Sequence, residues 1–326
     1  MDTYTSLNDV PHDFGPSAVT IGKFDGVHTG HKRVLDRLIS EARADSLTAT
    51  VLTFDRNPLT VLAPQVCPPE LVSNAQRLAL LERSGVDATV MLEFTRAFSE
   101  NSPRDFVEGM LVNTLHAKLV LVGADFKFGR RGAGNVAMLK DMGVEHGYRV
   151  ELLGDCELKD SRSNESRRVS STWVRELLAE GDVASASRLL GREPVVSATV
   201  VRGAQRGREL GFPTANLAPN AEGLIPADGV YAAWVVVGGE RYRAAVSIGN
   251  NPTFDCVAAK QVEAHLLGVG NDAIDIDLYG KTIEVHFVER LRGMVKFDSL
   301  AALISEMSDD VARVRALLPD EVFHTE

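Results

Sequence analysis

The sequence predicts two domains of different class: an α/β domain with a doubly wound parallel sheet, then a smaller β-rich domain with a C-terminal helix. Residues 17–154 alternate short runs of Val, Leu and Ile with helical patterns, which is typical of a parallel sheet covered on both faces. After Glu180 come short alternating strands joined by Gly, Pro and Asn, which indicates an antiparallel barrel or sandwich. With 326 residues, the chain is long enough for two hydrophobic cores.

In the first half, strands and helices alternate along the chain. The strands are expected at residues 17–22, 47–54, 88–94, 117–123 and 148–154. The helices, which show apolar residues at helical spacing, are expected at 31–44, 74–85, 102–115 and 136–147. In a doubly wound domain, ligands bind at the carboxyl ends of the strands.

The second half begins after a closing helix at residues 181–191. Its strands are expected at residues 192–201, 229–239, 240–249, 261–268 and 281–291, and a final amphipathic helix at 298–318. We therefore expect a first domain at residues 1–187, a linker at 188–194 and a second domain at 195–326.

Composition and charge exclude several classes of protein. Apolar residues make up 44% of the chain and charged residues 25%, the ordinary balance of a globular protein. A net charge of −10 argues against a general nucleic-acid or membrane-surface binder, because such a protein needs a basic face. The cysteines Cys67, Cys156 and Cys256 form no C-x-x-C pair, so neither a disulfide framework nor a zinc cluster is expected.

The N-terminal residues and the hydropathy of the chain predict a cytoplasmic protein. Residues 1–17 lack the basic start and apolar run of a signal peptide. No stretch approaches the ~18 uninterrupted apolar residues of a membrane span. We therefore expect neither nucleic acid nor a membrane among the partners, and we allow for a homo-oligomer.

The segment GKFDGVHTGH follows the first expected strand and opens the first helix. A helix N-terminus presents free N–H groups and the positive end of the dipole, which favours phosphate, and the glycines permit close approach of the backbone. His28 and His31, three residues apart, project on one side and can donate to an α-phosphate and a departing pyrophosphate. A loop histidine and a helix cap are the ordinary alternative, but the strand–glycine–helix context favours the phosphate site.

The segment VSSTWVR places hydroxyl side chains at the start of another helix, with Arg175 about one turn further on. Such hydroxyls are usually N-caps. A hydroxyl cluster with an arginine can also clamp a triphosphate through charge-assisted hydrogen bonds. Alone, the segment indicates capping more often than binding.

Together the two segments resemble the paired signatures of the H-x-G-H nucleotidyltransferase superfamily, and particularly of the bacterial bifunctional riboflavin kinase/FMN adenylyltransferase (FAD synthetase) family. The resemblance implies a nucleotidyltransferase domain in which His28 and His31 act in catalysis. It also implies ATP contacts for Gly22, Phe24, His28, Gly30, His31, Ser171, Thr172 and Arg175.

The flavin side of the family matches VGADFKFG, where the resemblance implies isoalloxazine contacts for Asp125 and Phe128. Phe126 and Phe128 alternate as on a strand, so the ordinary expectation is one core and one exposed aromatic ring. One departure stands out, because the family commonly shows T-F-D-P-H-P where this chain reads TFDRNP, with Arg56 and Asn57. The departure predicts slower or differently tuned adenylylation if that histidine assists the reaction.

The segment VRGAQRGRELGFPTANL is the most informative part of the second half. Gly203 and Gly207 flank a polar turn whose amides can face phosphates. Thr214 and Asn216, two apart in an extended segment, point to the same side and offer neutral oxygens suited to Mg²⁺ that carries nucleotide phosphates. For PTAN alone, a hairpin turn is the simpler interpretation.

The later segments follow the order of the riboflavin kinase family over most of residues 195–310, which implies an antiparallel β-barrel. The resemblance implies that Glu263 is the catalytic base, and more weakly that Arg292 lies in a flap near the flavin. Without the resemblance, the ordinary interpretation of Glu263 is a strand residue whose carboxylate points outward. The segment DLYGKT is expected to be a hairpin turn, because Asp275 stands where a G-x-x-x-x-G-K-[ST] loop needs glycine.

The leading hypothesis is a two-step enzyme. The second domain would phosphorylate riboflavin to FMN with ATP and Mg²⁺, and the first would adenylylate FMN to FAD and release pyrophosphate. One alternative keeps the kinase with a weak or inactive adenylyltransferase domain. Others are a non-catalytic flavin- or nucleotide-binding regulator and a transferase for a different metabolite, such as a pantetheine or nicotinamide nucleotide.

Overall fold

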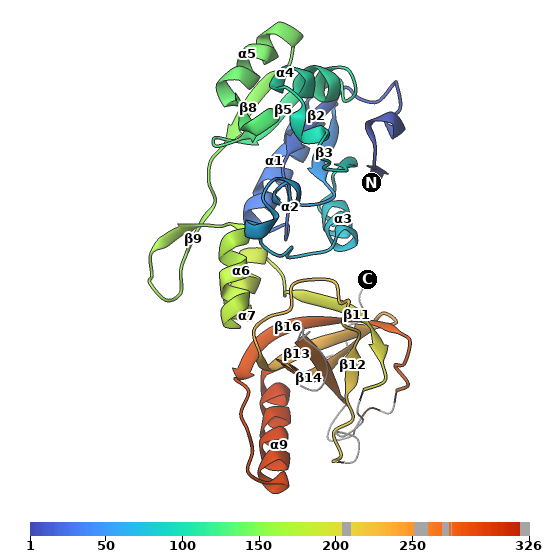
Figure 1. Cartoon of the computed structure of the whole chain (residues 1–326), viewed down its shortest axis with the longest axis vertical. Helices are drawn as coiled ribbons and strands as arrows, with labels where there is room; N and C mark the ends of the chain where they lie inside the picture. Colours follow the sequence, from blue (N-terminus) through green and yellow to red (C-terminus); the bar gives the residue numbers. More distant parts are fainter. Residues whose placement is uncertain (204–209, 251–259, 269–273, 275, 320–326) are drawn as a thin grey trace. The chain divides into compact units, whose positions relative to one another are not determined.

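The computed structural model describes residues 1–203, 210–250, 260–268, 274 and 276–319. The contacts divide the chain into two compact units, Met1–Ser171 and Thr172–Glu326. Figure 1 shows the elements of each unit along the chain. The division by contacts falls before the expected linker at 188–194, and the predicted limits of the functional domains stay a prediction.

The first unit contains a six-stranded parallel sheet with the strand order β1-β4-β3-β2-β5-β8. The strands are β1 (Asp2–Tyr4), β2 (Ser17–Ile21), β3 (Thr48–Phe54), β4 (Ala88–Leu92), β5 (Ala117–Gly123) and β8 (Arg149–Leu153). Strands β2 and β4 are buried along their whole length, as runs of apolar residues on a two-sided sheet require. The predicted parallel sheet is confirmed, and β1 is an additional edge strand.

Helices cover both faces of this sheet. Leu119 and Leu121 of β5 pack in one apolar cluster with helices α1 and α3, whereas Val120 and Val122 pack in another with α4 and α5. The helical elements are α1 (Thr29–Ala44), α2 (Leu59–Leu62), α3 (Asn74–Arg83), α4 (Pro103–Phe106), the π-helix η4 (Val107–Val112) and α5 (Val136–His146). In place of the helix expected at 102–115, the structure has one turn of α-helix continued by a π-helix. The doubly wound arrangement is confirmed.

Short elements complete the first unit. The 3₁₀ turns are η1 (Leu7–Asp9), η2 (Pro64–Val66), η3 (Phe98–Glu100) and η5 (Arg130–Gly132). Two hairpins pair β6 (Lys127–Phe128) with β7 (Gly134–Asn135) and β9 (Glu157–Lys159) with β10 (Ser166–Arg168). Both hairpins follow strands at the carboxyl edge of the sheet, where ligands bind in this fold class.

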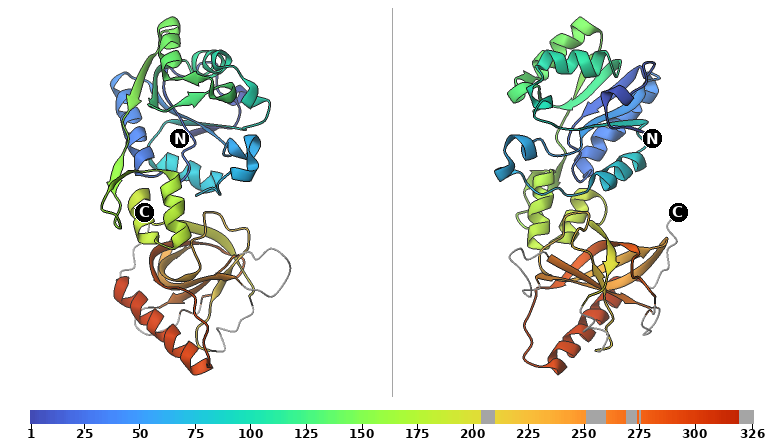
Figure 2. Two further views of the ribbon diagram at one scale, coloured as in Figure 1. Left: turned by 60° about the vertical axis from the view of Figure 1, so that its left-hand side comes forward. Right: turned by 45° about the vertical axis from the view of Figure 1, so that its right-hand side comes forward.

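The second unit is built on a closed antiparallel barrel with the order β11-β12-β15-β14-β13-β16 (Figure 2). Its strands are β11 (Val195–Val201), β12 (Ala215–Leu217), β13 (Gly229–Val237), β14 (Glu240–Asn250), β15 (Lys260–Leu267) and β16 (Thr282–Arg292). Ile283, Val285 and Phe287 of β16 are buried and alternate with residues on the outside, as a barrel strand requires. The barrel is confirmed and the sandwich excluded.

Helices α6 (Ser171–Glu180), α7 (Val183–Leu190) and α9 (Leu300–Leu317) complete the chain. Val314 and Leu318 pack against Trp234 and Leu267 on the barrel, so the expected C-terminal helix is present. A turn closes at Leu278–Lys281, where the Lys281 N–H donates to the Leu278 carbonyl at 3.0 Å. No strand precedes that turn within 276–278, so DLYGKT forms a turn but not a hairpin there.

The helices of the described ranges were compared with the requirements of a membrane span, and none combines sufficient length with sufficient hydropathy. Cys67 and Cys156 are free thiols, and Cys256 lies outside the described residues.

Candidate functional site

The histidine segment connects β2 to α1 at the carboxyl edge of the parallel sheet. His28 is the N-cap of α1, and its Nδ1 accepts a hydrogen bond from the His31 N–H at 3.2 Å. Because a neutral imidazole that accepts at Nδ1 carries its hydrogen on Nε2, this bond fixes the tautomer of His28. The N-cap thus turns His28 into a hydrogen-bond donor through Nε2 at a helix N-terminus, where anions bind.

The two imidazole rings are stacked, with centroids 3.7 Å apart and an interplanar angle of 12°. Burial lowers the pKa of His31 well below its ordinary value, and the nearby His28 and Lys23 lower it further. The Nδ1 atom of His31 is buried and has no hydrogen-bond partner among the described residues. A neutral imidazole with a buried, unsatisfied nitrogen at the edge of the sheet is suited to bind a polar ligand.

The backbone between β2 and α1 is strained. Phe24 and Val27 have φ values of 49° and 38°, in the left-handed region that non-glycine residues seldom adopt. Such conformations cost about 1–3 kcal/mol each and persist only where the surroundings enforce them. The ring of Phe24 is buried and lies 5.0 Å from the ring of His31. The predicted ATP residue Phe24 therefore packs directly against His31, a predicted catalytic residue.

Gly30 is needed for close approach within the histidine pair. A Cβ atom at this position would lie 3.1 Å from Cε1 and Nδ1 of His28, tighter than most real contacts. The Ser171 hydroxyl donates to the Asp25 carbonyl at 2.8 Å, so the structure brings Ser171 to the histidine segment together with Gly22, Phe24, His28, Gly30 and His31. Thr172 and Arg175 lie on α6 in the second unit, and their ATP contacts stay a prediction.

The segment TFDRNP follows β3 at the same edge of the sheet. Asn57 is buried, and its Oδ1 accepts a hydrogen bond from the Leu59 N–H at 3.1 Å, which forms an Asx turn just before the short helix α2. Arg56 is exposed and pairs with Asp55 and Glu93. Asn57 thus has a structural role in the turn, whatever its part in the reaction.

An aromatic cavity of about 500 Å³ lies beside the sheet. Phenylalanines from several loops line it: Phe54, Phe94, Phe98, Phe106, Phe126 and Phe128. Phe126 and Phe128 both face the cavity with their rings 5.6 Å apart and nearly parallel, so the expectation of one core and one exposed ring is wrong. The wall is rich in aromatic rings, and the nearly parallel rings of Phe126 and Phe128 offer a surface on which a planar ligand such as an isoalloxazine ring can stack.

The predicted flavin contact Asp125 does not line this cavity. Its carboxylate accepts a hydrogen bond from Arg168 at 2.9 Å, and Arg168 also pairs with Asp155 at 2.9 Å. The hydrogen bond from Arg168 holds the pKa of Asp125 below its ordinary value. Arg168, which immediately precedes the VSSTWVR segment, is a residue that sequence reasoning missed, because its partners are distant in sequence.

The barrel contains a second cavity, of about 600 Å³, lined by Gly203, Thr214 and Asn216 among others. A Cβ atom at Gly203 would overlap the buried amide of Asn216, so the two segments are in close contact. The structure thus brings together the predicted ATP residue Gly203 and both predicted metal ligands. Gly207 lies outside the described residues.

Glu263 lies on β15 next to this cavity. The hydroxyl of Thr214 donates to its carboxylate at 3.3 Å, and the strand register pairs Glu263 with Asn216. Two residues on, His265 is buried and its Nδ1 lies 2.8 Å from the Pro213 carbonyl, which fixes the start of the PTAN segment. Burial lowers the pKa of His265. Sequence reasoning missed this role of His265, since only the strand pairing reveals it.

Arg292 does not line the barrel cavity. Its guanidinium binds Asp310 of α9 through Nε at 3.1 Å and Nη2 at 2.7 Å, and it also pairs with Glu306 at 3.2 Å. Asp310 is only 3% exposed, so this ion pair fastens α9 to the end of β16. The flavin contact of Arg292 stays a prediction.

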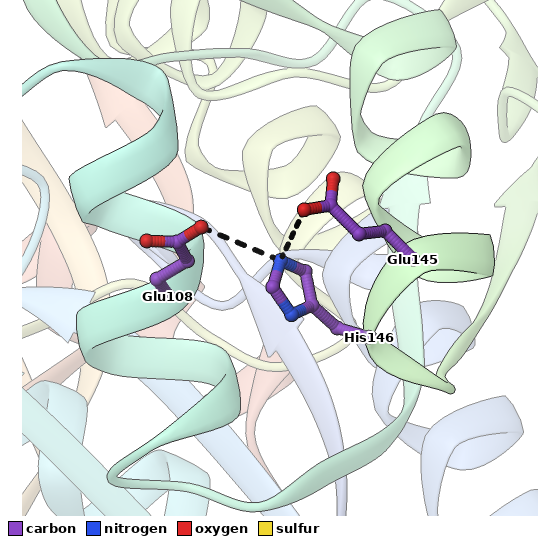
Figure 3. Close-up of side chains that lie close together, drawn as sticks. All are labelled: Glu108, Glu145 and His146. Carbon is purple, nitrogen blue, oxygen red and sulfur yellow. Dashed lines mark ion pairs between the residues drawn. The ribbon is translucent and has the colours of Figure 1, made fainter.

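Among the described residues, one cluster of potential metal ligands has three members: Glu108, Glu145 and His146 (Figure 3). Arg104 already binds the same carboxylate oxygens, Glu108 Oε1 at 2.7 Å and Glu145 Oε1 at 2.9 Å. A guanidinium in this position supplies the positive charge that a cation would bring. The cluster is an ion-pair network between η4 and α5.

Comparison with known proteins gives results for both units. A family model described as FAD synthetase matches residues 10–172, and one described as Riboflavin kinase matches residues 190–318. A protein of Haemophilus influenzae, named bifunctional riboflavin kinase/FMN adenylyltransferase, is 35% identical over 302 residues, 92% of this chain and 93% of that protein. A protein of the same name from Escherichia coli is 35% identical over 298 residues, 91% of each chain.

A solved structure titled "Crystal Structure of Macrolide-efflux Protein from Streptococcus pneumoniae" is also similar to this chain. It has a TM-score of 0.82 and 29% sequence identity, and the match covers 96% of this chain and 98% of that chain. The fold of the chain, with both of its parts, is therefore shared with a protein of known structure.

Proposed function

The chain belongs to the bifunctional riboflavin kinase/FMN adenylyltransferase family, and on this premise we propose how its residues divide the two reactions. The protein phosphorylates riboflavin to FMN and adenylylates FMN to FAD, with ATP as co-substrate of both steps. The observation that carries this conclusion is the presence of both family models, in order, on one chain. The alternatives, a weak adenylyltransferase domain or a regulator without turnover, are not supported.

In adenylylation, a phosphate oxygen of FMN attacks the α-phosphorus of ATP, and pyrophosphate leaves. Catalysis of such a step is chiefly positioning and charge stabilisation. We assign the triphosphate to the N-terminus of α1, where the Nε2–H of His28 donates to a phosphate oxygen and the neutral His31 binds beside it. The fixed tautomer of His28 and the buried Nδ1 of His31 support this assignment.

The aromatic cavity is the proposed site of the flavin ring, with Phe128 as part of its wall. The roles of Asp125, Ser171, Thr172 and Arg175 remain as predicted from the family motifs. The pairing of Asp125 with Arg168 suggests that both act at the polar end of the flavin site, since their charges balance when no ligand is bound.

In the kinase step, Glu263 accepts the proton of the riboflavin 5′-hydroxyl, whose oxygen attacks the γ-phosphorus of ATP and displaces ADP. The cavity lined by Gly203, Thr214 and Asn216 is the proposed nucleotide site. Thr214 links the proposed nucleotide site to the proposed base, because its hydroxyl donates to Glu263. Gly207 and Arg292 are proposed to contribute to nucleotide and flavin binding respectively.

The donor set of the barrel site fits Mg²⁺. Thr214 and Asn216 offer neutral oxygens beside the Glu263 carboxylate, and hard oxygen ligands are what Mg²⁺ binds together with nucleotide phosphates. When bound, the ion neutralises charge on the transferred phosphoryl group. Thr214 and Asn216 would hold it, while Glu263 handles the proton.

We further propose functional domains at residues 1–187 and 195–326, and a cytoplasmic location, since three cysteines in 326 residues fit a reducing compartment. The reactants define the partners as riboflavin, FMN and ATP, and a homo-oligomer is compatible with the proposal.

The test is incubation of the purified chain with riboflavin, ATP and Mg²⁺, with FMN and FAD quantified separately. Both products are expected in sequence. A parallel reaction supplied with FMN isolates the second step. FMN without FAD would contradict the adenylyltransferase assignment, and neither product would contradict both.

A further inference from the structure

Arg77 is a buried arginine behind the histidine segment. It lies on α3 and is 4% exposed, yet it belongs to no predicted motif and lines neither of the two cavities described above. Its Nη1 donates to the Lys23 carbonyl at 2.8 Å, and its Nη2 donates to the Asp55 carbonyl at 3.4 Å and to the Asn74 side chain. One guanidinium therefore binds the loop that follows β2 and the loop that follows β3.

The carbonyl held by Arg77 belongs to the peptide before Phe24. The Thr53 hydroxyl also donates to it, at 3.3 Å. Phe24 has a φ of 49°, a conformation that needs external support. The ring of Phe24 lies 5.0 Å from the ring of His31. The orientation of the Lys23–Phe24 peptide sets the position of the Phe24 ring, and with it the contact that supports the His31 ring.

The charge of Arg77 is balanced from several directions. Burial lowers the pKa of Arg77, while the carboxylates of Glu70, Asp25 and Asp55 raise it. Asp25 accepts the Leu71 N–H at 2.9 Å, and Asp55 accepts the Phe94 N–H at 2.9 Å. The carboxylates are thus fixed by their own hydrogen bonds, which leaves the guanidinium as the bridge between the two loops.

We propose that Arg77 is a positioning residue for adenylylation: by binding the Lys23 and Asp55 carbonyls, it maintains the loop conformation that supports His31 through Phe24. The inference rests on the proposed function of the first unit. Arg77 touches no substrate. Its effect passes through the Lys23–Phe24 peptide to the histidine pair, so it changes the rate of the chemical step more than the binding of ATP.

Two substitutions test the proposal. Arg77→Lys keeps the charge that balances the three carboxylates, but an ammonium lacks the planar fork that binds two carbonyls at fixed geometry. Arg77→Met removes the donors. We expect kcat for FMN adenylylation to fall about 100-fold in Arg77→Met, as for a misplaced catalytic group, and less in Arg77→Lys, with KM for ATP close to that of the wild type.

The same chain supplies the controls. Riboflavin phosphorylation by the second domain should be unchanged in both variants. Arg83→Met, at the exposed end of α3, is the matched control for loss of an arginine and should leave both activities unchanged. A folded Arg77→Lys protein with wild-type kcat, or a loss confined to KM or to thermal stability, would overturn the proposal. Wild-type protein that makes no FAD from FMN would instead refute the proposed function itself.

Discussion

The two reaction sites are built by different means. In the first unit the proposed ATP residues Gly22, Phe24 and His28 lie on a loop, residues 22–28, whose backbone is strained at Phe24 and Val27. Gly30 and His31 follow in the first turn of α1. In the barrel, Asn216 and Glu263 face each other across the antiparallel pair β12–β15, and Thr214 directly precedes β12. The loop keeps its shape through contacts from other parts of the fold, whereas strand register determines the geometry of the barrel site.

This difference predicts how each site responds to substitution. A loop site is sensitive at residues that maintain its shape, such as Gly30, where a Cβ would press on the His28 ring, and Arg77, which binds two loop carbonyls. A site determined by strand register is sensitive mainly at its reacting side chains, because backbone hydrogen bonds keep the strands in place. Since both sites lie on one chain, each activity serves as the internal control of the other.

The largest effect is expected for Glu263→Gln. Loss of a general base lowers phosphorylation of riboflavin by roughly 10²–10⁴-fold, while adenylylation of supplied FMN is retained. Rates of FMN and FAD formation, measured separately, check this. Glu289→Gln, an exposed carboxylate on β16, is the matched control. If Glu263→Gln kept full kinase activity, Glu263 would be an ordinary strand carboxylate.

The next effect is expected for Gly30→Ala. The added Cβ lies 3.1 Å from the His28 ring, so the ring must shift, and adenylylation should fall by about 10- to 100-fold with the kinase unaffected. Gly109→Ala is the control, because a Cβ there meets nothing within 4 Å among the described residues. Equal activity of Gly30→Ala and the wild type would show that the histidine loop adapts freely.

A smaller effect is expected at Asn57. Asn57→Ala removes the hydrogen bond that the Asn57 side chain accepts from the Leu59 N–H and should cost the first unit about 1 kcal/mol of stability, measured by urea unfolding. Asn57→His, which restores the residue common in the family, should leave FAD formation unchanged, because an imidazole nitrogen can also accept this bond. A clear increase in the rate of FAD formation with Asn57→His would instead support the alternative hypothesis of a weak adenylyltransferase domain.

The smallest effect is a pH response of opposite sign in the two units. The pKa of His31 is lowered by burial, so between the folded and unfolded pKa values only the unfolded chain binds the proton, and the first unit loses stability as pH falls below about 6.5. The pKa of His286 is raised by its bonds to Glu193 and Glu284 against the effect of burial. In a His265→Asn background, which removes the opposite contribution of that buried histidine, the barrel therefore loses stability as pH rises above about 6.5.

Hydrogen exchange, corrected for intrinsic rates, resolves the two units separately. Protection of β2 and α1 should fall between pH 8 and pH 5.5, while protection of β13 and β16 should rise. Each response should disappear in His31→Asn and His286→Asn respectively. Responses of the same sign in both units would contradict the assignment of these histidines.

Much of the fold could be predicted from the sequence. The apolar runs of β2, β3, β4 and β5 and the alternation in β16 carry their own signal, because side-chain periodicity reflects which faces are buried. The π-helix in residues 107–112 could not be predicted, since its pattern matches an α-helix. Strand β1 is only three residues long and has too little pattern to be recognised.

The candidate sites were predictable where chemistry lies within one short segment. His28 and His31 are three residues apart on one helix turn, and their predicted common side is confirmed by the stacked rings. The aromatic cavity was largely missed, because Phe54 ends β3 whereas Phe94 and Phe98 follow β4, and these rings meet only when the sheet forms.

The sequence by itself determined the two fold classes, the order of the domains and the motifs of both sites, because these depend on residue type at short spacing. Only the tertiary structure decided that burial favours the neutral form of His31 and that Arg77 joins two loops. Burial and the directions of hydrogen bonds arise from contacts between distant segments, and local sequence does not record them.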